Sequence, residues 1–384
     1  MTQKKSVDKE TYIILFVIIA GFGGLGKVMG IGNLFNTIMN TAHDLLLNTV
    51  FFIMAISVVT GAISGLLAEF GVISLLNKLI SPLMRPLYGL PGAASLGVLS
   101  TFVSDNPAIL SLAKNKGFTK YFKEYQIPAL CNLGTGYGMG MILVTYMMGL
   151  SYDGIIGAAW TGVLGACIGS VISVRLMLKS TRKYYGISKE EFRADHSRKA
   201  DRSDDTEMRT VHGSVPERVL NSLLEGGKTG VQLGMDIIPG VLCICTFVMI
   251  LTFGAPEGGI YTGAAYEGVG LLPKLGEMIS PLTTVLFGFK DPSNIAFPIT
   301  SLGATGAAMA LVPKMLETGA AGMNEVAVFT AMGMCWSGYL STHISMMDAL
   351  NKRQFIKNAI LSHTIGGLCA GVAAHYLYVI FSMI

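Results

Sequence analysis

Long apolar stretches alternate with short polar connections along nearly the whole chain. A bilayer core requires about 20 apolar residues per helix, and several stretches are long enough for a complete crossing. They lie at residues 11–28, 46–70, 120–149, 154–179, 228–254, 325–349 and 357–382. The pattern therefore predicts an all-α polytopic membrane protein.

Two further apolar regions, 90–117 and 289–317, are each interrupted at the centre. The interruptions are Ser104-Asp105-Asn106-Pro107 and Gly303-Ala304-Thr305-Gly306. Half-helices of about a dozen residues extend only about 18 Å at the rise of an α-helix, which is too short for a core of about 30 Å. We expect both regions to form re-entrant helical hairpins, whose tips must lie against protein or line a cavity.

Composition agrees with this prediction. Of 384 residues, 51% are hydrophobic and 14% are charged, whereas about a quarter are charged in an ordinary soluble protein. A soluble enzyme is therefore excluded. Residues 180–218 hold 9 Lys/Arg and 8 Asp/Glu, 17 of the 52 charged residues, and we expect a cytoplasmic linker there. Its near neutrality argues against binding of nucleic acid.

The distribution of Lys and Arg predicts the orientation. Of 28 such residues, 24 fall on the side of the membrane that holds the N-terminus and the linker. The residues on the other side are Lys27, Lys274, Lys290 and Lys314. Because cytoplasmic loops are rich in Lys and Arg, we expect a multi-pass protein of the plasma (inner) membrane with a cytoplasmic N-terminus. An odd number of crossings then places the C-terminus outside. The first apolar run shows no small-residue cleavage site, so we expect an uncleaved transmembrane helix.

The two halves of the chain resemble each other. Residues 79–89 read LISPLMRPLYG and residues 278–288 read MISPLTTVLFG, identical at six of eleven positions with an offset of 199. The same offset aligns the two hairpin interruptions, and residues 132–137 with residues 331–336. The crossing count places the leading helices of the two units, 46–70 and 228–254, in opposite directions. Inverted repeats with broken helices are typical of secondary transporters.

The predicted organisation has four parts. Residues 1–45 form an N-terminal helix and an amphipathic segment, and residues 46–179 form repeat 1 with its hairpin at 90–117. Residues 180–218 are the linker, and residues 219–384 form repeat 2 with its hairpin at 289–317. In each repeat we expect a leading helix, an amphipathic helix, the hairpin, a helix broken near its middle and a final helix.

The hairpin tips carry the first candidate binding residues. Half-helix ends leave backbone N–H and C=O groups without partners, and a ligand can satisfy them. Ser104, Asp105 and Asn106 form the first tip, and an acid near the middle of a bilayer is costly enough to suggest function. Asp105 is thus a candidate ligand for substrate or for a coupling cation, Na⁺ or H⁺; alternatively these residues only cap the half-helix. At the second tip Thr305 and Gly306 could bind an electronegative group, or form only a tight turn.

The broken helices add a second set of candidates. Asn132, Thr135 and Ser337 could hydrogen-bond a polar solute, and Tyr137 and Trp336 could stack on a planar one. The alternative is that these side chains only pack between helices. Weaker candidates are Asp236 in a leading helix, His343 and Asp348.

Enzyme motifs are absent from the sequence. There is no HExxH and no GxSxG, and the segment EGGKT at 225–229 lacks a glycine that a phosphate-binding loop requires. The cysteines show no metal-binding spacing. We therefore expect no enzyme activity, no ATP hydrolysis and no cofactor other than Na⁺ as a candidate coupling ion.

The repeated order of elements resembles the nucleoside-recognition (Gate) domain membrane proteins. This family includes the spore maturation membrane proteins and is similar in architecture to the concentrative nucleoside transporters. The resemblance begins at about residue 46 and implies an elevator-type carrier, often a trimer, whose hairpin tips and broken helices hold substrate. Those transporters place Gln, Thr and Glu at the first tip and an Asn–Glu pair in the broken helix. Here the tip holds Ser104, Asp105 and Asn106, and Leu133 follows Asn132.

The sequence thus predicts a secondary, cation-coupled transporter in the lipid bilayer. Its substrate would be a small polar metabolite, either nucleoside-like or a small organic or amino acid, and the protein would be a homo-oligomer, a dimer or a trimer. The alternative function is a non-transporting Gate-domain scaffold or accessory protein of the spore-maturation type.

Overall fold

The computed structural model describes residues 7–104, 107–188, 190–192, 213–256 and 258–383. These ranges form helices and connecting loops and contain no β-strand. Within them, five helices are long and apolar enough to cross a membrane: Lys9–Met29, Ile31–Glu69, Ile155–Tyr185, Val215–Thr252 and Arg353–Phe381. The predicted all-α polytopic membrane fold is confirmed.

The leading helices are longer than the sequence suggested. After α1 (Lys9–Met29), one 39-residue helix is formed by α2 (Ile31–Asp44), the π-helical turn η1 (Leu45–Val50) and α3 (Phe51–Glu69). A 38-residue helix is formed by α12 (Val215–Pro239), the π-helical turn η3 (Gly240–Cys245) and α13 (Thr246–Thr252). A π turn inserts a residue without ending the helix. The amphipathic segment before residue 46 is therefore not a separate element, because it continues into α3.

The remaining helices form two matching series. The first comprises α4 (Val72–Leu83), η2 (Met84–Tyr88), α5 (Ala94–Val103), α6 (Pro107–Lys114), α7 (Lys116–Thr119), α8 (Ala129–Thr135), α9 (Gly140–Gly149) and α10 (Ile155–Tyr185). The second comprises α14 (Leu271–Phe287), η4 (Pro292–Ile295), α15 (Ala296–Gly303), α16 (Thr305–Met309), α17 (Val312–Glu317), α18 (Met323–Trp336), α19 (Tyr339–Ala349), η5 (Arg353–Phe355) and α20 (Ile356–Phe381). A shift of 199 residues superimposes the start of α9 on the start of α19.

Backbone turns repeat with the same shift. Three pairs of equivalent positions adopt positive φ: Gly71 (76°) and Gly270 (60°), Gly89 (77°) and Gly288 (70°), and Met139 (55°) and Gly338 (65°). Each glycine can adopt this left-handed conformation without a steric penalty. The turns that start the amphipathic helices, end them and break the later helices are therefore shared by both units.

Equivalent helices pack antiparallel at very short distances. In α3 and α12, Gly61 lies against Gly226 and Gly65 against Ser222, so residue numbers rise along one helix as they fall along the other. The final helices α10 and α20 meet in the same way, with Gly169 against Gly366. Helices that are equivalent and antiparallel run through a membrane in opposite directions. The predicted inverted repeat is thus confirmed by the packing.

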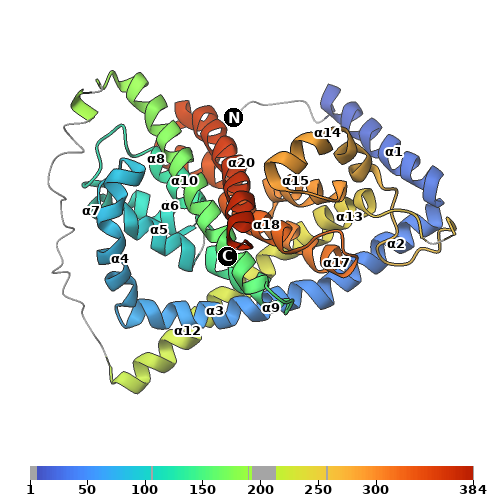
Figure 1. The fold of residues 1–384 in the computed structure, drawn as a ribbon, viewed down its shortest axis with the longest axis horizontal. Coiled ribbons are helices and arrows are strands. Elements are labelled where there is room, and N and C mark those ends of the chain that lie inside the picture. Colours follow the sequence, from blue (N-terminus) through green and yellow to red (C-terminus); the bar gives the residue numbers. More distant parts are fainter. Residues whose placement is uncertain (1–6, 105–106, 189, 193–212, 257, 384) are drawn as a thin grey trace.

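Figure 1 shows how the two units are arranged around these helices. The final helices α10 and α20 stand at the centre. The amphipathic helix and hairpin of the first unit (α4, α5 and α6) lie to their left, and α14, α15 and α17 of the second unit lie to their right. The long α2–α3 helix and α12 cross below both.

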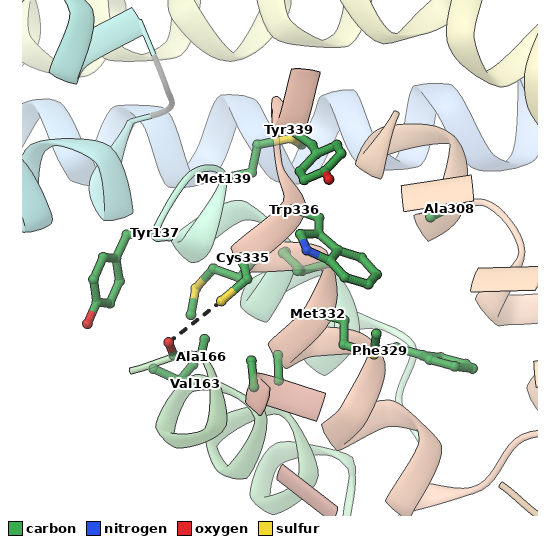
Figure 2. Close-up of a cluster of buried hydrophobic side chains, with 14 of the residues drawn as sticks. Tyr137, Met139, Val163, Ala166, Ala308, Phe329, Met332, Cys335, Trp336 and Tyr339 are labelled. Atoms are coloured by element: carbon green, nitrogen blue, oxygen red, sulfur yellow. Dashed lines mark hydrogen bonds between the residues drawn. The ribbon is translucent and has the colours of Figure 1, made fainter. Parts of the chain in front are cut away.

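A pseudo-twofold axis passes between the two broken helices. Cys335 Sγ lies 3.9 Å from the carbonyl oxygen of Gly136, and these two positions are each other's equivalents, 199 residues apart. Two equivalent residues can touch only close to the axis that relates them. Cys335 also donates to the carbonyl oxygen of Ala166 at 3.6 Å (Figure 2), so that the axis runs through a tightly packed apolar cluster.

Several boundaries differ from those expected. The helix predicted from residue 120 begins only at Ala129, because residues 121–128 form turns. The breaks lie at 136–139 and 337–338, slightly after the aligned segments 132–137 and 331–336. The α10 helix continues to Tyr185, so it includes the first six residues of the predicted linker. The division of the chain into four parts remains a prediction.

A loop between α13 and α14 has no counterpart in the first unit. It spans residues 253–270, whereas α3 and α4 are joined by Phe70 and Gly71 alone. Its carbonyl groups at Tyr261 and Gly263 accept hydrogen bonds from Asn33 and Asn40 of α2, each 2.8 Å long. Tyr266 donates through its N–H to Thr41 (3.0 Å) and through its hydroxyl to Asp44. The loop therefore fastens α2 to the second unit.

Inside this loop the carboxylate of Glu267 organises the backbone. It accepts the hydroxyl of Thr262 at 2.6 Å and the N–H groups of Thr262 (3.0 Å) and Gly263 (2.9 Å). Burial alone would raise the pKa of Glu267, but these hydrogen bonds outweigh burial and lower its pKa.

The glycine contacts yield a first prediction. A Cβ at Gly226 would lie 2.2 Å from the carbonyl oxygen of Gly61, whereas a Cβ at Gly157 on α10 would meet nothing within 4 Å. We expect Gly226→Ala to destabilise the protein by about 1–3 kcal/mol through overpacking. Gly157→Ala should be neutral or slightly stabilising, since alanine favours helices. Thermal unfolding of both variants in the same detergent measures the difference, and equal midpoints would contradict the close crossing.

The lowered pKa of Glu267 yields a second prediction. A carboxyl with a lowered folded-state pKa stabilises the fold fully above its ordinary pKa of 4.5, and this contribution is lost as the pH falls through the folded value. Glu267→Gln should therefore melt below the wild type at pH 7, and the gap should close as the pH falls well below 4.5. Melting curves over a pH series test this; a gap that stays constant with pH would refute it.

Candidate functional site

The tip of the first hairpin packs on the leading helix of its own unit. The hydroxyl of Ser64 on α3 donates to the carbonyl oxygen of Val103, the last residue of α5, at 3.0 Å. Carbonyl groups at a helix C-terminus have no partner within the helix, so this contact satisfies one of them. Beside it lies a cavity of about 630 Å³, the size of a small-molecule site.

Three elements enclose this cavity. The leading helices contribute Ser57, Gly61, Ser64, Gly65 and Ala68 from α3 and Glu225, Gly226, Thr229, Gly230, Gln232, Leu233 and Asp236 from α12. The first hairpin contributes Ser100, Val103, Ser104 and Ala108, and Ile73 and Ile142 complete the lining. Because glycines bring α3 and α12 together, backbone and short hydroxyl side chains form much of the surface.

Asp236 is the most informative side chain in this lining. Its carboxylate accepts a hydrogen bond of 2.7 Å from the side-chain amide of Gln232, one helical turn earlier. Both lie within an apolar helix long enough to span a membrane, where ionisable residues normally face a cavity or a partner. Sequence reasoning had ranked Asp236 below Asp105. The overlooked signal was the spacing of polar residues 225, 229, 232 and 236, which places them on one helix face.

The first-tip candidates fall partly inside the described structure. Ser104 is exposed and lines the cavity. Asp105 and Asn106 lie outside the described residues. Their predicted role in binding remains a prediction.

The second hairpin tip is closed. The hydroxyl of Thr305 donates to the carbonyl oxygen of Gly333 on α18 at 3.1 Å, and Ser301 donates to Thr305 at 3.0 Å. A Cβ at Gly306 would lie 2.9 Å from the side chain of Ile237 on α12. Thr305 and Gly306 therefore hold the tip against its neighbours and do not line the cavity.

The candidates from the broken helices are buried as well. Thr135 donates to the carbonyl oxygen of Cys131 within α8 at 2.7 Å, and the hydroxyls of Tyr137 and Tyr88 hydrogen-bond each other. Trp336 donates to the carbonyl oxygen of His363 at 3.4 Å, and Ser337 is buried at the break. Figure 2 shows Tyr137 and Trp336 pointing away from each other on opposite sides of Cys335. These side chains do not face a common space.

Asn132 belongs to a separate polar network. Its side-chain N–H₂ group donates to the carbonyl oxygen of Ala359 on α20 at 2.9 Å and to the hydroxyl of Ser173 on α10 at 3.0 Å. Ser173 in turn contacts Nδ1 of His363 at 2.9 Å. All three side chains are completely buried. The structure thus joins Asn132 to two residues that the sequence analysis had not connected with it.

Metal binding finds no support in the described residues, which contain no group of three or more His, Cys, Asp or Glu side chains suited to hold an ion. Asp348, as expected, lies near a helix end and pairs with Arg353 at 3.2 Å. The cavity with Asp236 and Gln232 is therefore the candidate functional site.

Comparison with other sequences gives little. No protein-family model matches the chain. An uncharacterized protein of Alkalihalophilus pseudofirmus is 24% identical over 237 residues, which cover 60% of this chain and 50% of that protein. The chain thus spans half the length of this curated relative.

Comparison of structures is more informative. An outward-facing structure of the concentrative nucleoside transporter CNTnw covers 99% of this chain and 94% of that chain, with a TM-score of 0.52 and 18% identity. An intermediate state covers 96% and 85% (0.54, 17%), and an inward-facing, substrate-bound state covers 98% and 93% (0.52, 16%). At these identities the likeness establishes a common fold. The architecture expected from the resemblance is thereby confirmed, whereas membership of the Gate family is not shown.

The contrast between the two tips yields a third prediction. In a Cys243→Ser background, which removes an exposed native thiol, a cysteine replacing Ser64 or Ser104 should react with a charged, water-soluble maleimide. A cysteine replacing Thr305, which is 3% exposed, should react only after denaturation, because thiol reactivity requires the hydrated thiolate. Mass spectrometry measures the labelling. Equal labelling at both tips would contradict an open first tip and a closed second tip.

Proposed function

We propose that the protein is a secondary transporter that binds a small polar solute in the cavity between α3, α12 and the first hairpin. The cavity itself carries this proposal, because its largely apolar lining brings Asp236, Gln232 and several hydroxyl groups together between helices long enough to span a membrane. A cavity with an ionisable side chain inside a membrane-spanning fold is what a carrier requires and what a purely structural protein does not.

The lining favours solutes that donate hydrogen bonds. Asp236 and Glu225 supply carboxylates, Gln232 supplies an amide, and no Lys or Arg lines the cavity among the described residues. Solutes with several hydroxyl or amine groups fit this chemistry, which keeps nucleoside-like compounds and amino acids as the first classes to test. Glu225 is paired with Lys228 at 2.5 Å, so Asp236 is the carboxylate that would repel a strongly anionic solute.

Alternating access would follow from the two-unit architecture. The glycine-mediated crossing of α3 and α12 forms a closely packed frame, and the first hairpin touches that frame through few polar contacts, such as Ser64 to Val103. We infer an elevator-type movement of the hairpins and broken helices against the frame. The range of states known for CNTnw, from outward-facing to inward-facing, supports this inference for the shared fold.

Three related expectations stay predictions. They are the coupling to a Na⁺ or H⁺ gradient, the assembly into a dimer or trimer, and the cytoplasmic N-terminus with an external C-terminus.

Transport assays supply the fourth prediction. Purified protein in liposomes should accumulate at least one solute from a panel of labelled nucleosides, amino acids and organic acids under a Na⁺ or pH gradient. Asp236→Asn removes the charge from the cavity, and loss of a hydrogen bond to a charged group, about 1.5–3 kcal/mol, should lower uptake about 10- to 100-fold. Asp105→Asn tests the sequence-based candidate separately.

Glu217→Gln is the matched control. Glu217 lies on the same helix as Asp236 but in the capping box of its first turn, where glutamine serves equally well. It should leave uptake unchanged. If the wild type moves none of the panel, the transporter proposal fails and a scaffold role is favoured. If Asp236→Asn matches the wild type, the cavity is not the binding site.

A further inference from the structure

The rings of two histidines are in contact inside the protein, close to the broken helices, with their planes tilted by 49°. The ring centroids of His343 on α19 and His363 on α20 are 4.7 Å apart, and neither side chain is exposed. The sequence analysis treated His343 as a weak candidate and did not consider His363. Neither residue lines the cavity described above.

The hydrogen bonds of His363 fix its tautomer. Its Nε2 contacts the carbonyl oxygen of Cys335, which can only accept, so Nε2 carries the proton. Its Nδ1 must then accept from the hydroxyl of Ser173, and Ser173 accepts from Asn132. The network therefore runs in one direction, from Asn132 through Ser173 and His363 to Cys335, and His363 is neutral.

His343 differs because one of its nitrogens lacks a partner. Its Nδ1 donates to the carbonyl oxygen of Tyr339, so Nε2 is an unprotonated acceptor. This Nε2 is buried and has no hydrogen-bond partner among the described residues, and the same holds for Oδ1 of Asn132. The amide of Asn132 cannot be reversed, because its oxygen would then oppose the carbonyl oxygen of Ala359.

The two unpartnered acceptors belong to neighbouring helices. α8 and α19 are in contact, and Cys131 Sγ, adjacent to Asn132, lies 3.9 Å from the carbonyl oxygen of Thr342, adjacent to His343. A buried acceptor without a donor costs free energy. One added proton on His343 Nε2 would turn this unpartnered acceptor into a donor.

The inverted repeat provides an internal control for this network. The positions equivalent to Asn132, Ser173, His343 and His363 are Ala331, Val372, Val144 and Leu164. All four equivalents are aliphatic, and Ala331 and Val144 are buried like Asn132 and His343, so the fold itself does not require polar groups at those two places. Buried polar groups that packing does not require indicate a function.

We propose that His343, with its unpartnered Nε2 beside the Asn132–Ser173–His363 network, is the site that binds the coupling proton. This inference extends the proposed transport function and rests on it, because a bound proton is a coupling proton only in a transporter. A proton is the fitting ligand because an imidazole nitrogen binds H⁺ directly, whereas Na⁺, a hard cation, takes oxygen ligands. The reaction is protonation of the Nε2 lone pair, without any change of redox state.

The surroundings link proton binding to conformation. On the elements packed against His343, the titratable and charged groups are Cys131 on α8, the exposed Lys114 on α6 and His363 on α20, whereas α15 has none. Further along α20 lie Lys357, Cys369, His375, Tyr376 and Tyr378. On α19 itself lie Tyr339 and the exposed Asp348, which pairs with Arg353 of η5. No carboxylate is thus buried with His343 in the described part of the chain. An imidazolium without a counter-charge is costly in this buried position, so protonation favours a conformation in which His343 is more hydrated.

Fluorescence of Trp336 can report the protonation of His343 without a transport assay. The chain has two tryptophans, so Trp160→Phe leaves Trp336 as the single reporter. Its ring centroid lies 6.2 Å from that of Tyr339, which in turn lies 6.1 Å from that of His343. We expect a reversible, single-step loss of Trp336 emission between about pH 8 and pH 4 in purified full-length protein.

Three variants in this background identify the titrating group. His343→Val introduces the residue found at the equivalent position 144, and His343→Gln keeps hydrogen bonding without titrating; both should abolish the transition. His375→Gln alters a half-buried histidine that contacts Asn324 at 2.7 Å and should leave it unchanged. A flat titration of the reporter protein, or a transition that persists in both His343 variants, overturns the proposal. A water molecule bridging the two acceptors would give the flat result.

Uptake in liposomes separates this inference from the proposed function. Solute accumulation driven by a pH gradient should be lost in His343→Gln and retained in His375→Gln. Uptake driven by Na⁺ alone, with no fluorescence transition, would refute the proton site and leave the transporter proposal standing. A His343-dependent transition in a protein that transports nothing would refute the transporter proposal and leave His343 as a proton-binding site.

Discussion

Backbone carbonyl groups at the ends of interrupted helices are the constraint on which this structure depends. A helix that stops inside an apolar medium leaves its last carbonyls without partners. Side chains donate hydrogen bonds to these carbonyl oxygens. Ser64 donates to Val103 at the end of α5, Thr305 donates to Gly333 near the end of α18, and His363 donates to Cys335 in the same turn. Each donor comes from a different helix, so each break can exist only because another helix of the same unit packs against it. The positions of the hairpins and final helices follow from these contacts.

The same packing makes the two units chemically unequal. Both share their turns, their breaks and the order of their helices, but the first hairpin opens onto the cavity that contains Asp236 and Gln232, and the second is held closed by Thr305. The network at Asn132 is also confined to one place, because the equivalent positions in the repeat hold aliphatic residues. A duplicated fold therefore provides one frame and two different environments. Binding and closure can then be assigned to different tips of one symmetric framework.

Local signals explain what the sequence could predict. The hairpin interruptions and the repeat were visible because glycine, proline and capping residues determine backbone turns within a few positions. The importance of Asp236 was not visible, because its cavity forms where α3 meets α12, between residues more than 150 positions apart. The partners of Asn132 were hidden for the same reason: Ser173 and Ala359 reach it from two distant helices. Helix continuity through η1 and η3 was missed because a π turn has no clear signature in hydropathy.

The loop at 253–270 has an energetic consequence for a carrier built in this way. If inverted units exchange their conformations during a cycle, units of identical construction would make the two end states equal in free energy. Only the second unit holds α2 through a loop, with hydrogen bonds to Asn33, Asn40, Thr41 and Asp44. In such a carrier the two end states would therefore differ in free energy, and without solute the population would favour one of them. A loop remote from the cavity would thus determine the resting conformation.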